Sequence, residues 1–130
     1  MVFIAALLND DVDIHTKLGG EIDSIIIQIR NHKLVNDQYV VHFPIPASQF
    51  WDNVVYTCSM MLIFNDEEEV NDWCSRHRKP KGEVLPINQV WELAKVWYGN
   101  YLESNFRRKN KEIAEAMFRQ VGLTSTFWKL

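Results

Sequence analysis

The stretch Val54–Phe64, with the sequence VVYTCSMMLIF, is the longest apolar run in the chain, and it leads directly into NDEEEVNDWCSRH at positions 65–77. A run this apolar on both of its alternating faces favours a central strand. Asn65 and Asp66 are both suitable N-cap residues, and the three glutamates that follow complement the positive end of a helix dipole. We therefore predict a strand over 54–64 followed by a helix that ends near His77, before the helix-stopping Pro80.

Three further strands are predicted before this stretch. Val12–Lys17 alternates between apolar and polar residues, and the glycine pair in Leu18-Gly19-Gly20 is typical of a hairpin turn. Ile22–Ile29 contains three consecutive isoleucines, which favours a strand that is buried on both faces. Gln38–Phe43 is the third, and the prolines of Pro44-Ile45-Pro46 end it because they cannot donate to a ladder.

The chain after this stretch is predicted to be mainly helical. Pro86 is expected to open a helix whose apolar stripe runs at helical spacing to Leu102. A last helix is predicted over Lys109–Val121, and Leu123–Leu130 forms a tail whose aromatic residues dock on the body. Strands followed by helices predict an α+β fold, with a small antiparallel sheet and helices packed on one face.

Length and charge narrow the possible functions. The 130 residues are enough for one domain, over residues 1–130, and the formal charge of −3 gives no reason to expect nucleic acid as a partner. No apolar run approaches the roughly 18–20 residues that span a bilayer, and Met1–Leu8 lacks the basic start and cleavage site of a signal peptide. We expect a cytoplasmic protein, no membrane partner, and no cofactor, since no phosphate-binding or metalloprotease motif is present.

Both cysteines lie within the 54–77 stretch, and their roles differ. Cys58 in a core strand is either a small buried hydrophobe or a functional thiol. Cys74 shares the buried helix face with Trp73, so core packing is the preferred interpretation. A disulfide between the two cysteines stays open at this stage. His15 is expected to be a solvated strand residue, and the basic residues at 107–111 are expected to be a solvated helix entry.

Four ordered features carry a family resemblance. They are a cysteine that opens an apolar strand, Cys58–Phe64; an acidic helix with Asp72-Trp73 and then His77; a Gly-Glu-Val-Leu-Pro segment at 82–86; and a helix with Trp-Glu-Leu-Ala at 91–94. With this order and spacing, the segment from Tyr56 to Leu102 resembles the C-terminal part of the organomercurial (alkylmercury) lyases. The resemblance implies the α+β fold of that family.

The resemblance also implies a chemistry, which is protonolysis of a carbon–mercury bond. In that family two cysteine thiolates capture the organic mercury cation, and a carboxylate takes part in proton transfer to the departing carbon. Cys58 matches the second of these cysteines, so it is the expected catalytic residue and metal ligand. The family's N-terminal helical domain and its Cys-x-x-Asp motif, which holds the first cysteine and the aspartate, are not expected within this sequence.

Two functions from different classes follow. The first is an organomercurial-lyase-like protein, in which Cys58 serves carbon–metal bond cleavage or a diverged reaction on the same scaffold. The second is a non-catalytic module that binds a soft metal ion or a protein partner. Whether the chain is an enzyme therefore stays open here. The expected ligands are an organomercurial or a soft metal ion, and a homo-oligomer or a partner chain would complete the site.

Overall fold

The computed structural model describes residues 6, 10–21, 23–53, 59–98 and 110–130 of the chain. Its strands are antiparallel and form two small sheets, and helices pack against them, so the predicted α+β class is confirmed. The strands are β1 (Val12–Lys17), β2 (Ser24–Arg30), β3 (Lys33–Leu34), β4 (Val40–Phe43), β5 (Leu62–Phe64) and β6 (Glu83–Pro86). The longer helices are α3 (Glu67–His77), α4 (Ile87–Tyr98) and α5 (Lys111–Gln120). The described residues also form the short 3-10 turns η1 (Leu18–Gly20), η2 (Ala47–Gln49) and η3 (Thr126–Trp128).

The first sheet has the strand order β1-β2-β3 and begins with the predicted hairpin. The glycine pair forms η1 between β1 and β2, and Gly19 has a φ of 58°, which a glycine adopts without strain. The prediction that the isoleucine strand is buried on both faces is wrong. Ile27 is buried whereas Ile26 is 46% exposed, because nothing in the described chain covers the outer face of the hairpin.

The second sheet has the order β5-β4-β6, with β4 at its centre. Of the stretch predicted as one strand over 54–64, the structure describes residues 59–64, and only the last part of these is a strand. Ser59 and Met60 are helical and β5 begins at Leu62, so the prediction is wrong at positions 59–60 and confirmed for Leu62–Phe64. Residues 54–58 lie outside the described part of the chain. A continuous apolar run does not separate a buried strand from a buried helical segment by its pattern alone.

Helix α3 follows the sequence prediction closely. Asp66 is the N-cap, and its side chain accepts a hydrogen bond from the backbone N–H of Glu69. The helix ends where Arg78 adopts the left-handed conformation. Pro86 is the last residue of β6 rather than the first of α4, and the backbone N–H of Ile87 donates to the carbonyl oxygen of Tyr39, the residue before β4. The predicted continuation of this helix to Leu102 falls outside the described residues.

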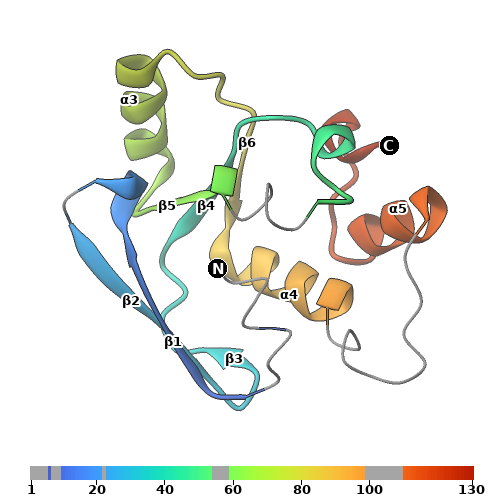
Figure 1. Cartoon of the computed structure of the whole chain (residues 1–130), viewed down its shortest axis with the longest axis horizontal. Helices are drawn as coiled ribbons and strands as arrows, with labels where there is room; N and C mark the ends of the chain where they lie inside the picture. Colours follow the sequence, from blue (N-terminus) through green and yellow to red (C-terminus); the bar gives the residue numbers. More distant parts are fainter. Residues whose placement is uncertain (1–5, 7–9, 22, 54–58, 99–109) are drawn as a thin grey trace.

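Helices cover both faces of the β5-β4-β6 sheet. Alternation along the strands sends Val41, Ile63 and Leu85 to the α4 side, where the main core lies. Val40, Phe64 and Val84 point to the α3 side, where a smaller cluster forms with Val70 and Cys74. Figure 1 shows α3 above the turn end of the β1–β2 hairpin, and α4 and α5 together on the other side of the molecule.

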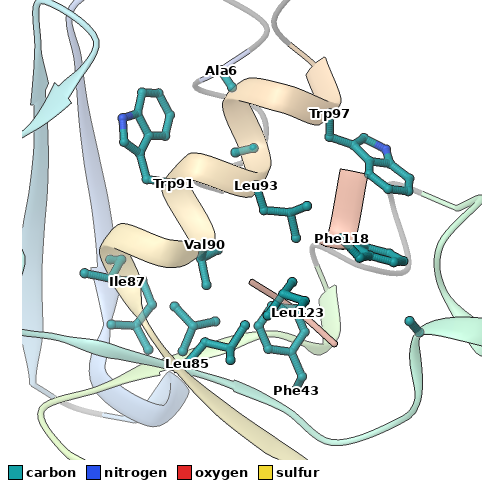
Figure 2. Packing of buried hydrophobic residues seen from close by; sticks show 14 of the residues in the cluster. Ala6, Phe43, Leu85, Ile87, Val90, Trp91, Leu93, Trp97, Phe118 and Leu123 are labelled. Atoms are coloured by element: carbon teal, nitrogen blue, oxygen red, sulfur yellow. The ribbon is translucent and has the colours of Figure 1, made fainter. Parts of the chain in front are cut away.

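The main core is built around α4 and closed by the C-terminal segment. Figure 2 shows Val90 and Leu93 of α4 directed toward Phe43 and Leu123. The predicted docking of the tail is confirmed, because Trp128 is 2% exposed and its ring lies 5.1 Å from that of Phe43. In the described part of the chain, no helix combines the length and the apolar character that crossing a membrane requires.

Candidate functional site

The polar chemistry of the described chain is concentrated between the β5-β4-β6 sheet and α3. His42 of β4 points into this layer and is 1% exposed, the one buried polar side chain among the described residues. Its Nε2 lies 2.6 Å from the carbonyl oxygen of Lys81, which can only accept, so Nε2 carries the proton and donates. The rings of Phe64 and Trp73 lie edge-on to it at 6.2 and 5.9 Å.

The surroundings of His42 determine its charge. Burial lowers the pKa of His42, and the hydrogen bonds to the backbone carbonyls of Lys81 and Pro80 oppose that shift only in part. The ring is therefore neutral at neutral pH and acts as a fixed hydrogen-bond donor. The loop from Lys79 to Gly82 is held against the sheet by this bond.

Cys74 of α3 lies beside His42. Its Sγ is 3.7 Å from His42 Nε2 and 3.8 Å from the carbonyl oxygen of Pro80, to which the thiol donates. Burial raises the pKa of the Cys74 thiol, and the positive charge of Lys81 opposes this only in part. The side chain is 8% exposed and the thiol is free, so the disulfide that the sequence left open is not formed. A neutral, enclosed thiol is a poor nucleophile, which supports the packing interpretation.

The open end of this layer is closed by contacts between η1 and α3. The Glu21 carboxylate accepts from Arg76 at 2.9 Å and lies 3.5 Å from His77 Nε2, and the hydrogen bond from Arg76 holds the pKa of Glu21 below its ordinary value. The ring of His77 also stacks on Trp73, with 4.5 Å between the ring centroids. A Cβ atom on Gly19 would lie 2.9 Å from Phe64, so only glycine lets the turn approach this closely.

A groove of about 430 Å³ opens between η1 and α3. Its lining includes the ring of Phe64 and four carboxylates, from Glu21, Asp23, Glu69 and Asp72. Glu21 is engaged by Arg76, and Glu69 accepts hydrogen bonds from Asn65. No group of three or more His, Cys, Asp or Glu side chains in the described ranges is arranged to hold a metal ion.

The residues singled out in the sequence fall in different places. Cys58, the expected catalytic residue and metal ligand, lies outside the described residues, so its role stays a prediction. His15 is exposed on the polar face of β1, as expected. Of the basic cluster at 107–111, Lys111 is exposed at the start of α5, and positions 107–109 are not described.

His42 was missed by the sequence reasoning. The strand predicted for it, QYVVHF at 38–43, has no pattern of polar residues that singles out one side chain. The partners that give His42 its environment are 32 and 39 positions away. The available signal is weak. It is a histidine in a strand whose opposite face carries the apolar Val41 and Phe43, followed later in the chain by Cys74 on the buried face of a helix.

Comparison with known proteins agrees with the fold and with the motif order. The family model MerB, described as alkylmercury lyase, matches residues 2–99, which include every strand of both sheets, α3 and α4. The chain belongs to the alkylmercury lyase family. The C-terminal α5 and η3 lie beyond the matched residues.

A solved structure gives the same relationship in three dimensions. The crystal structure of the mercury-bound form of MerB2 matches with a TM-score of 0.55 and 28% sequence identity. The match covers 78% of this chain and 48% of the MerB2 chain, so this chain spans about half the length of that relative. No curated protein matches the sequence significantly.

Proposed function

We propose that this protein binds organomercurials or related soft metal cations through the thiolate of Cys58, on an alkylmercury-lyase scaffold. The observation that carries the proposal is the match to the mercury-bound form of MerB2, at 28% identity over 78% of the chain. The family match over residues 2–99 includes the position of Cys58. Mercury and its organic cations are soft and prefer thiolate ligands over oxygen and nitrogen.

Cleavage of the carbon–mercury bond needs more groups in the site than one thiolate. In protonolysis the carbon–mercury bond breaks, the carbon takes up a proton, and mercury stays on its thiolate ligands. This requires a second ligand and a proton donor held near the carbon. Cys74 supports neither role, because its thiol is enclosed beside His42 and donates to Pro80. We therefore propose that the second ligand and the acid are supplied from outside these 130 residues, for example by a partner chain or a second copy.

The enclosed state of Cys74 also favours a second candidate function. If Cys58 is the thiol that serves mercury, the chain on its own captures the cation without cleaving it. It then acts as a soft-metal-binding module. Both functions use the Cys58 thiolate to bind mercury, but only cleavage releases the hydrocarbon. One experiment that measures both bound mercury and released hydrocarbon therefore separates them.

The experiment uses phenylmercury with an excess of free thiol. The native protein, Cys58→Ser and Cys74→Ser are each incubated with the reagent, bound mercury is quantified, and the headspace is assayed for benzene. We expect the native protein and Cys74→Ser to retain mercury and Cys58→Ser to lose it. Benzene release that depends on Cys58 supports lyase activity, and retention without benzene supports the binding module.

A labelling experiment checks the assumption beneath both functions. The native protein is treated with a thiol reagent and the modified cysteine is mapped. Labelling of Cys58 under native conditions, with Cys74 protected, is the expected result. If Cys58 reacts only after unfolding, or if Cys58→Ser binds mercury as well as the native protein does, the proposal fails.

A further inference from the structure

We propose that β1 is a docking edge for a second copy of this chain, and that two antiparallel β1 strands join their hairpins into one continuous sheet. In the strand order β1-β2-β3, β1 lies at one edge. The opposite edge of β2 is covered by β3, and beyond it the Asn36 side chain bonds to the backbone of Gln28 and Ile26. One edge of this sheet is thus covered by β3 and Asn36, whereas at the other edge β1 is the outermost described strand.

The register shows which backbone groups face the open edge. The N–H of Leu18 donates to Asp23, which makes this a hydrogen-bonded pair, and the register from Val12↔Ile29 to Lys17↔Ser24 continues from it. Because hydrogen-bonded and non-hydrogen-bonded pairs alternate in an antiparallel ladder, the even-numbered residues of β1 bond to β2. The N–H and C=O groups that point outward are those of Asp13, His15 and Lys17.

These outward groups are available in the described chain. Among the described elements, β1 has its extensive contacts with β2, and no backbone hydrogen bond to any other described element involves Asp13, His15 or Lys17. Their side chains are all exposed. A row of unpaired strand groups at regular spacing is a template for another strand.

The edge is complementary to itself. When two copies meet antiparallel around His15, Asp13 of each copy faces Lys17 of the other, and all the outward-pointing residues meet one another in hydrogen-bonded pairs. One oxygen of Asp13 is bonded to Arg30 at 2.6 Å, and its Oδ2 has no hydrogen bond among the described residues. Opposite charges placed directly across a strand pair stabilise it. A two-fold pairing therefore gives both the charged side chains and the outward backbone N–H and C=O groups a partner.

The outer face of the hairpin adds an apolar contribution. A groove of about 530 Å³ at the turn end of the hairpin is lined by residues from both of its faces: His15, Thr16, Lys17, Ser24, Ile25 and Ile26. Ile26 is the cross-strand neighbour of His15 and is exposed, so pairing would extend this row across both copies. Standard protein interfaces bury at least roughly 1,200 Å² of surface, and pairing along one strand of six residues buries less than that. We therefore expect a weak dimer, with a Kd of about 10–100 µM.

Sedimentation velocity of the full chain, at about 1–300 µM around this expected Kd, tests the proposal. His15→Pro removes an outward N–H that the β1–β2 ladder does not use, and Lys17→Asp places two carboxylates opposite each other. Both are expected to weaken dimerisation at least about tenfold, which corresponds to 1.4 kcal/mol. Lys111→Asp, an equal change of charge at the exposed start of α5, is the matched control and should dimerise like the native chain.

Mixing two variants tests the register itself. Asp13→Lys and Lys17→Asp should each dimerise poorly alone, whereas their mixture restores both opposite-charge pairs and should form a heterodimer. A native chain that stays monomeric over the whole range overturns the proposal. So does a dimer that His15→Pro and Lys17→Asp leave unchanged, because the partner would then use another face.

Discussion

The two faces of the β5-β4-β6 sheet bury different kinds of side chain. On the α4 face, Phe43, Leu85 and Trp128 belong to a continuous apolar core. On the α3 face the apolar cluster is small, and beside it lies the neutral ring of His42. His42 and the protonated thiol of Cys74 donate to the carbonyls of Lys81 and Pro80. The protein loses stability when a buried polar group loses its hydrogen-bond partner. When an apolar side chain is shortened, the loss of stability grows with the volume of the cavity left behind. The α4 face should therefore carry most of the stability, and the α3 face should carry the sensitivity to pH.

The largest effect is expected from Trp128→Ala on the α4 face. The indole ring packs against Phe43, Phe50 and Phe118, and its Nε1 donates to Glu83 at 2.6 Å. Removal of a buried aromatic ring leaves a cavity, and we expect a loss of about 3–5 kcal/mol in the free energy of unfolding. Urea denaturation measures it, with the exposed Val35→Ala as the control. A loss no larger than that of a change on the α3 face would contradict the comparison.

The next largest loss of stability is expected from Gly82→Ala, in the 79–82 loop where it contacts β4. Gly82 has a φ of 56°, and a Cβ atom there would lie 1.9 Å from the carbonyl oxygen of Phe43. Gly82→Ala must shift backbone on both sides of the contact, at a cost of about 2–3 kcal/mol. The same denaturation series measures this cost. Gly122→Ala, at a similar left-handed φ but with only the flexible end of Gln89 nearby, should cost less.

How far the sequence predicts each face depends on the range of the interactions. Local patterns were sufficient for β1, the glycine turn, the Asp66 cap and the apolar stripe of α4, because each depends on residues within a few positions. The family resemblance was also available locally, since its motifs follow one another along the chain. The environment of His42 was not predictable, because α3 and the 79–82 loop create it from positions more than 30 residues away. The helical conformation of Ser59–Met60 likewise depends on tertiary context that an apolar run does not encode.

A smaller effect is expected from His42→Leu on the α3 face. Leucine fills similar space but leaves the Lys81 carbonyl without its donor, at a cost of about 1–2 kcal/mol. The 79–82 loop should loosen over Cys74, so native-state labelling of Cys74 by a thiol reagent should become faster. His15→Leu replaces an exposed histidine on β1, in the other sheet, and is the matched control. Unchanged protection of Cys74 in His42→Leu would show that the loop is held by other contacts.

The smallest effect is the pH dependence of stability that His42 creates on the α3 face. Burial lowers the pKa of His42 in the folded protein below its ordinary value of 6.5, so between the two pKa values the unfolded chain binds more protons than the folded one. The effect of His42 should therefore be absent above pH 6.5, and stability should fall as the pH is lowered from that value toward the folded-state pKa of His42. Unfolding free energies measured by urea denaturation at a series of pH values should show this slope in the native protein and lose it in His42→Leu. Trp128→Ala should lower the whole curve and keep the slope at about pH 6, because it leaves His42 and its partners on the other face unchanged. If Trp128→Ala flattened the slope, the two faces would not act independently.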